Sequence, residues 1–244
     1  MIEAGLWGLS AASSLVLGAV VAFAVRVPER IQGLILAFGA GILFGAVAYE
    51  LVEDAARASM TGLDVGVGFA AGAAVFYVGS VAIDRLSAAP STGLASHRDP
   101  RVGGLATVLG AVLDGIPESI VLGLTLVPGG GVAFPVLVAI FLSNVPESLS
   151  ATRDLLAGGF ERSRVVGLWL IVVAVSGVAA AAGYGLLDSA PVSLTVGMQA
   201  FAAGAILAML AESMIPEAYE TGGRAVGLAT AFGFAVAAYL ALAP

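Results

Sequence analysis

Long apolar runs separated by short polar loops constrain the fold of this chain more than any other feature of its sequence. A membrane-crossing helix needs roughly 20 apolar residues to span a hydrocarbon core of about 30 Å. Only 11% of the 244 residues are charged, well below the level of about 25% in soluble domains. We therefore expect an all-α polytopic membrane protein, a single domain over residues 1–244 with eight transmembrane helices. The predicted spans are at about 5–25, 32–53, 63–85, 103–127, 132–156, 164–187, 193–217 and 223–242.

The composition also excludes several classes of partner and site. The chain has no Cys, so it can form neither disulfides nor thiolate metal sites. Its few basic residues lie in short loops and form no basic face, which argues against a nucleic-acid partner. No phosphate-binding loop occurs in the sequence, so we expect no nucleotide cofactor.

The arginines indicate how the chain is oriented in the membrane. All ten basic residues are Arg, and nine of them lie in or beside the loops that follow the first, third, fifth and seventh spans. Only Arg57 lies on the opposite side. Because basic loops remain in the cytoplasm, we expect a plasma or inner membrane protein whose N- and C-termini are both outside the cytoplasm.

Two stretches of the sequence resemble each other and indicate an internal repeat. "AFGAGILFGAVAYELVEDA" at 37–55 aligns without gaps with "AFAAGAILAMLAESMIPEA" at 200–218. These stretches lie in the second and seventh spans, an odd number of crossings apart, so the two copies run in opposite directions. We therefore expect an inverted repeat that relates spans 1–3 to spans 6–8, an arrangement common in secondary transporters.

A second pair of similar motifs lies on the central spans 4 and 5. "LDGIPES" carries Pro117 and Glu118, and "LSNVPES" carries Pro146 and Glu147. Proline has no N–H, so each helix leaves a backbone carbonyl without its usual donor, beside an acidic residue. Irregular backbone of this kind is tolerated at membrane depth only where it is buried in protein or lines a cavity.

These residues predict a cation site between spans 4 and 5. A carboxylate at the centre of a lipid-facing helix costs about 2.5 to 3.5 kcal/mol, so the acids are expected to face the bundle interior. Asp114 and Glu118 share one face of their helix. The predicted metal ligands are Asp114, Glu118, Ser143, Asn144 and Glu147. Alternatively, Asp114 and Glu118 form a structural pair that shares a proton or bonds to neighbouring helices.

The same motifs resemble those of the ZIP (Zrt/Irt-like) divalent metal transporters. "LDGIPES" and "LSNVPES" are similar to the paired His-Asn-x-Pro-Glu-Gly and His-x-x-Pro-Glu motifs on the fourth and fifth spans of that family. Eight spans and outside termini are also typical of the family, so the resemblance covers the whole chain. Family members usually carry His at the positions of Asp114 and Ser143 and Asn at the position of Gly115. Many bacterial members have a Glu on span 6, where this chain has alanines around Ala180.

The resemblance implies membrane transport of a divalent cation toward the cytoplasm. The ion, of the zinc, manganese or iron class, is the substrate, and no cofactor is expected. The ends of spans 2 and 7 resemble family segments at the cytoplasmic mouth, which makes Glu50, Glu212 and Glu217 candidates for the exit pathway. The Gly-rich helix surfaces permit a homodimer.

An alternative function is an intramembrane hydrolase that uses Asp114, Glu118 or Glu147 as an acid–base pair. The sequence contains no H-E-x-x-H and no G-x-S-x-G motif, and an inverted repeat favours transport. We therefore expect a transporter and not an enzyme.

Overall fold

The computed structural model describes residues 1–59, 61–87, 100–126, 134–187 and 190–242. Within these ranges some helical side chains lie outside the described part, among them those of residues 100–107 and of Asp114. The described residues form helices and connecting turns, with no strand. The α-helices are α1 Ile2–Ala24, α2 Glu29–Ala46, α3 Glu53–Ala58, α4 Leu63–Ser87, α5 Pro100–Leu124, α6 Phe134–Ala157, α7 Arg162–Leu187, α8 Val192–Met209, α9 Ile215–Gly222 and α10 Val226–Leu242. Shorter π- and 3₁₀-helical elements are η1 Val47–Val52, η2 Leu210–Met214 and η3 Gly223–Ala225.

The all-helical fold is confirmed, and several of the helices are membrane-like. Within the described ranges, six helical stretches are long and apolar enough to cross a membrane: Ile2–Ala24, Glu29–Ala58, Leu63–Ala82, Phe134–Ala157, Arg162–Gly185 and Val192–Leu242. The last stretch holds α8, α9 and α10, and it turns at Gly223, where φ is 66°. Each predicted span overlaps a helical segment, and the count of eight crossings remains a prediction.

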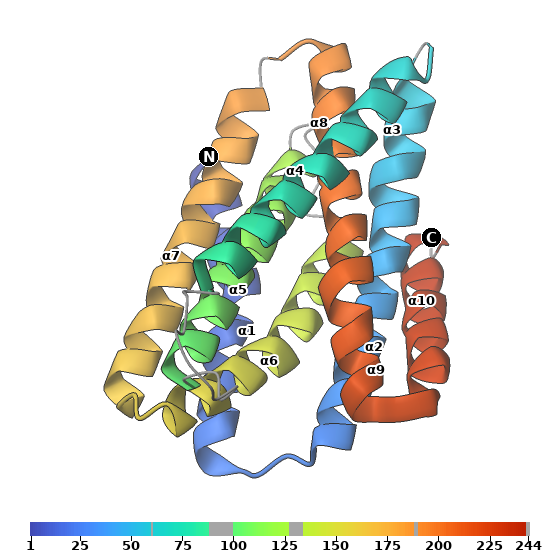
Figure 1. Ribbon diagram of the computed structural model, residues 1–244. Helices are drawn as coiled ribbons and strands as arrows, with labels where there is room; N and C mark the ends of the chain where they lie inside the picture. The colour runs from blue at the N-terminus through green and yellow to red at the C-terminus, as the bar shows by residue number, and fades with distance from the viewer. Residues whose placement is uncertain (60, 88–99, 127–133, 188–189, 243–244) are drawn as a thin grey trace.

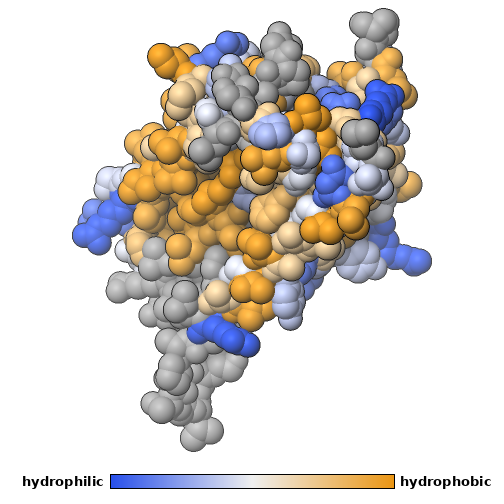
Figure 2. Space-filling model, turned by 90° about the horizontal axis from the view of Figure 1, so that it is seen from above, coloured by the Kyte–Doolittle hydropathy of each residue, from blue (hydrophilic) through white to orange (hydrophobic). Residues whose placement is uncertain are grey.

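The helices form an elongated bundle (Figure 1). Helices α2, α4, α8 and α10 pack mainly as two close pairs, α2 with α10 and α4 with α8. Helices α1, α5, α6 and α7 pack against one another, and α6 also contacts α2. The buried apolar residues divide in a similar way, with one core cluster around α2 and α8 and a second that joins α1, α5, α6 and α7. Figure 2 shows that apolar residues cover much of the surface seen from above, while hydrophilic residues form separate patches.

Glycines bring the paired helices into backbone contact. A methyl group built on Gly41 of α2 would lie 2.0 Å from the carbonyl oxygen of Thr230 on α10. On the other pair, a methyl group on Gly204 of α8 would lie 2.0 Å from the carbonyl oxygen of Phe69 on α4. No side chain fits at either position, and small residues at helix interfaces are the usual means of close packing in membranes.

Helices α2 and α8 have the same local design. Each begins directly after a proline, Pro28 or Pro191, and each spans 18 residues. Each then continues into a π-helical turn, η1 or η2, before the chain returns to α-helix. The alignment that pairs Ala37 with Ala200 also pairs the two prolines and the two π-helical turns. Such π-helical turns are rare in proteins, and those that occur are often found at functional sites.

Candidate functional site

Two of the three predicted acidic ligands lie on neighbouring helices of the group formed by α1, α5, α6 and α7. Glu118 is on α5 and is only 2% exposed. Glu147 is on α6 and is half-buried. Each follows a proline inside its helix, Pro117 or Pro146, and α5 packs against α6. The prediction that Glu118 faces the bundle interior agrees with its burial.

Neutral oxygens from α6 lie on the same segment as Glu147. Ser143 is 1% exposed and Asn144 is 6% exposed. The Ser143 hydroxyl donates to the carbonyl of Ile140 at 3.1 Å, so its oxygen lone pairs remain available to accept. Helix α2 packs directly on this segment, since a methyl group built on Gly39 would lie 3.1 Å from Cα of Ser143.

The structure adds Ser176 of α7, which the sequence analysis did not identify. Ser176 is 3% exposed, and its Oγ would lie 3.5 Å from a methyl group built on Gly115. Helical side chains lean toward the N-terminus of their helix, so Glu118 leans toward the turn that contains Gly115. The hydroxyl of Ser176 therefore lies beside the α5 turn between Asp114 and Glu118. Its only sequence signal is that it is a lone serine in the apolar run 165–183 of α7.

The full predicted ligand set is not assembled by the described residues alone. Asp114 belongs to α5, but its side chain lies outside the described part. Among the side chains that are described, no three of the types Asp, Glu, His and Cys gather closely enough to hold a metal ion. A site that includes Asp114 together with Glu118 and Glu147 remains a prediction.

The three pathway candidates lie at different heights in the bundle. Glu217 of α9 lies beside Ser150 and Asp154 of α6. Its helix ends near the start of α2, where a methyl group on Gly33 would lie 2.5 Å from the backbone nitrogen of Gly222. Glu50 belongs to η1, next to α3, and α3 and α9 are at opposite ends of the bundle (Figure 1).

These positions differ from the expectation that the three acidic residues lie together at one cytoplasmic mouth. Glu212 of η2 accepts a hydrogen bond of 3.0 Å from the hydroxyl of Ser80 on α4. Because α2 and α8 run in opposite directions, η1 and η2 cannot lie at the same end. Glu217 lies on α9, which directly follows η2, so Glu50 and Glu217 lie toward opposite ends of the bundle. A pathway that passed both residues would run along the length of the bundle.

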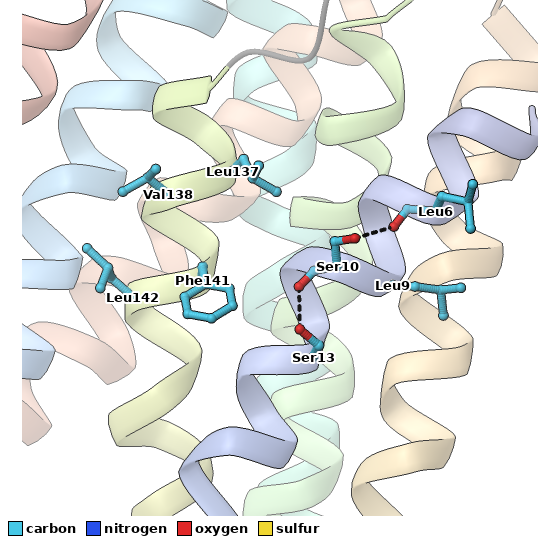
Figure 3. Close-up of a pocket in the computed structure, with 8 residues that line it drawn as sticks. All are labelled: Leu6, Leu9, Ser10, Ser13, Leu137, Val138, Phe141 and Leu142. Atoms are coloured by element: carbon cyan, nitrogen blue, oxygen red, sulfur yellow. Dashed lines mark hydrogen bonds between the residues drawn. The ribbon is translucent and has the colours of Figure 1, made fainter.

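A groove between α1 and α6 lies beside the candidate site (Figure 3). Its volume is about 640 Å³, and its α6 wall ends at Leu142, the residue before Ser143. The hydroxyls of Ser10 and Ser13 line it, but they donate to the carbonyls of Leu6 and Ser10 at 2.8 and 2.6 Å. The remaining lining is apolar, so this groove suits a hydrocarbon chain and not a cation.

Comparison with the models of known protein families finds no match, and comparison with curated proteins finds none either. The resemblance to ZIP transporters therefore rests on the motifs of the chain itself.

Proposed function

We propose that this protein transports divalent metal cations across a membrane, through a carboxylate site between α5 and α6. The observation that carries the proposal is the burial of Glu118, 2% exposed, on a helix that packs against the helix of Glu147, Ser143 and Asn144. An ionisable residue inside an apolar bundle is expensive, and by default it marks an ion or substrate pathway. A cation is the ligand that two carboxylates and neutral oxygens suit.

An inverted repeat and eight crossings belong to this proposal. They are supported by the matching starts and π-helical turns of α2 and α8. The glycine contacts support them as well. A methyl group on Gly72 of α4 would lie 1.8 Å from the carbonyl oxygen of Phe201, and one on Gly233 of α10 would lie 2.1 Å from that of Phe38. The alignment of α2 with α8 pairs Phe38 with Phe201, so the two contacts are equivalent. A pseudo-twofold axis through the site suits alternating access.

The orientation of the protein is proposed from the distribution of the arginines, and transport toward the cytoplasm from the resemblance to ZIP transporters. Arg153 donates to the carbonyl of Val27 at 2.8 Å, and the guanidinium of Arg162 lies 5.4 Å from the ring centre of Phe23. Both contacts are at the end of the bundle where α1 ends. Arg57 pairs with Glu53 on α3, at the other end. The end that contains Arg153 is cytoplasmic by the positive-inside rule.

The donor types favour a hard or borderline ion. Carboxylate, hydroxyl and amide oxygens suit manganese, and zinc or iron(II) also bind oxygen sites. Asp114 adds a third carboxylate in this proposal.

The test is metal uptake by the purified protein in sealed vesicles, with manganese, iron(II) and zinc offered separately. We expect Glu118→Gln and Glu147→Gln to abolish uptake, because each removes a charge while keeping the size of the side chain. Glu161→Gln is the matched control, since Glu161 is exposed before α7. Wild-type uptake by either site variant would refute the site. Elution as a folded species in size-exclusion chromatography separates loss of transport from loss of fold.

A further inference from the structure

A groove at the arginine-rich end of the bundle has the form of a lipid site. It lies between α2, α9 and α10, has a volume of about 630 Å³, and is lined by Phe44, Tyr219, Arg224, Gly227 and Phe234 among others. Ligand pockets in proteins usually have volumes of about 300 to 1,000 Å³. We infer that this groove binds one anionic phospholipid, with an acyl chain against α10 and the phosphate at Arg224.

The length of the groove fits one leaflet of a bilayer. Along α10 the lining extends from Arg224, just before the helix, to Phe234. Ten residues of helix rise about 15 Å, which is half of a hydrocarbon core of about 30 Å. The inner part of the groove is apolar, and the rings of Phe44 and Phe234 pack there with centres 5.8 Å apart. An acyl chain therefore finds apolar contacts along the depth of its own leaflet.

Arg224 supplies the complementary charge for the phosphate. Its side chain is exposed, and within the described part of the chain it forms no ion pair, even with Glu220 four residues earlier. Glu217 lies beside Ser150 and Asp154 on α6 and is not among the residues that line the groove. Basic pockets between membrane helices on the cytoplasmic side bind anionic head groups.

The other half of the bundle offers a natural control. When α4 is aligned with α10 so that Gly72 matches Gly233, Gly66 matches Gly227 and Leu63 matches Arg224. A methyl group on either Gly66 or Gly227 would meet no atom within 4 Å. Both positions therefore have open space beside the backbone, and Gly227 lines the groove that has Arg224 at its end.

The experiment is native mass spectrometry of the full-length protein equilibrated with equal amounts of phosphatidylglycerol and phosphatidylcholine. Wild-type protein should retain the anionic lipid preferentially. Arg224→Gln should lower that preference about fivefold, the factor that corresponds to the ~1 kcal/mol of one basic residue near an anionic surface. Arg162→Gln, an exposed arginine at the same end, should leave it unchanged.

A second pair of variants tests the acyl chain. Gly227→Phe should fill the groove and lower the retention of both lipids, whereas Gly66→Phe should not. The inference is overturned if Arg224→Gln keeps the wild-type preference, or if Arg162→Gln reduces it equally. It is also overturned if Gly227→Phe keeps its lipid, or if Gly227→Phe instead converts a dimer to a monomer with lipid retention unchanged. Metal uptake is not measured, so the result is independent of the proposed transport.

Discussion

A methyl group added at Gly72 should destabilise the protein, and the same change at Gly233 should do so to a similar extent. The added carbon at Gly72 would lie 1.8 Å from the carbonyl oxygen of Phe201, and at Gly233 it would lie 2.1 Å from that of Phe38. Ordinary contact begins at about 3.4 Å, so the helices must separate by roughly 1.5 Å. Overpacking of this kind typically costs about 1 to 3 kcal/mol. We expect the upper part of that range, because a backbone oxygen cannot rotate away.

The loss of stability can be measured as a lower Tm for unfolding in detergent, followed by the fluorescence of Trp7 and Trp169. For a protein of this size, each kcal/mol lowers Tm by about 2 to 4 °C, so Gly72→Ala and Gly233→Ala should each lower it by about 4 to 12 °C. Gly66→Ala and Gly227→Ala, on the same two helices, should leave Tm within about 2 °C of wild type. Equal Tm values for Gly72→Ala and Gly66→Ala would refute the backbone contact. A large loss at Gly72 without one at Gly233 would refute the equivalence of the two helix pairs.

Two further predictions concern the metal ligands and the arginine-rich end. Asp114→His should raise the preference for zinc over manganese in competitive vesicle uptake, because imidazole is a softer ligand than carboxylate; an unchanged or lowered ratio would mean that Asp114 does not contact the ion. Arg153→Ala should lower the free energy of unfolding by about 1 to 3 kcal/mol, because Arg153 donates to the buried side chain of Gln32 and to the carbonyl of Val27. Denaturant titration measures this loss, and a stability equal to wild type would show that water replaces both bonds.

The helical architecture was predictable because hydropathy and helix breakers act locally. The run predicted at 193–217 corresponds to α8 and α9, which together extend from Val192 to Gly222. Its start follows Pro191, a residue whose fixed φ suits the position before a helix. The π-helical turns had no local signal, because a shifted hydrogen-bond register depends on how neighbouring helices pack. The opposite directions of α2 and α8 separate Glu50 from Glu217 along the bundle, which differs from the expectation of one shared mouth, and their part in an exit pathway remains a prediction.

Only those residues of the candidate site that are unusual in their local sequence could be predicted. Glu118 is conspicuous because a carboxylate is rare in an apolar run, and its burial agrees with that expectation. Ser176 has no comparable signal, since hydroxyls also occur on exposed helix surfaces such as that of Ser10. Its relation to the site depends on which face α7 presents to Gly115, and that rotation is decided by tertiary packing.

The same packing explains how several buried hydroxyl groups are positioned in the bundle. Glycine on a neighbouring helix lies against several buried hydroxyl residues: Gly39 against Ser143, Gly18 against Ser148 and Gly115 against Ser176. The Ser143 and Ser148 hydroxyls donate to backbone carbonyls of their own helix, at 3.1 and 2.8 Å. Their positions therefore depend on the approach of backbones and not on partner side chains. Because well-packed interiors transmit displacement, a substitution at Gly39 reaches the Ser143 segment through the backbone, without changing any proposed ligand.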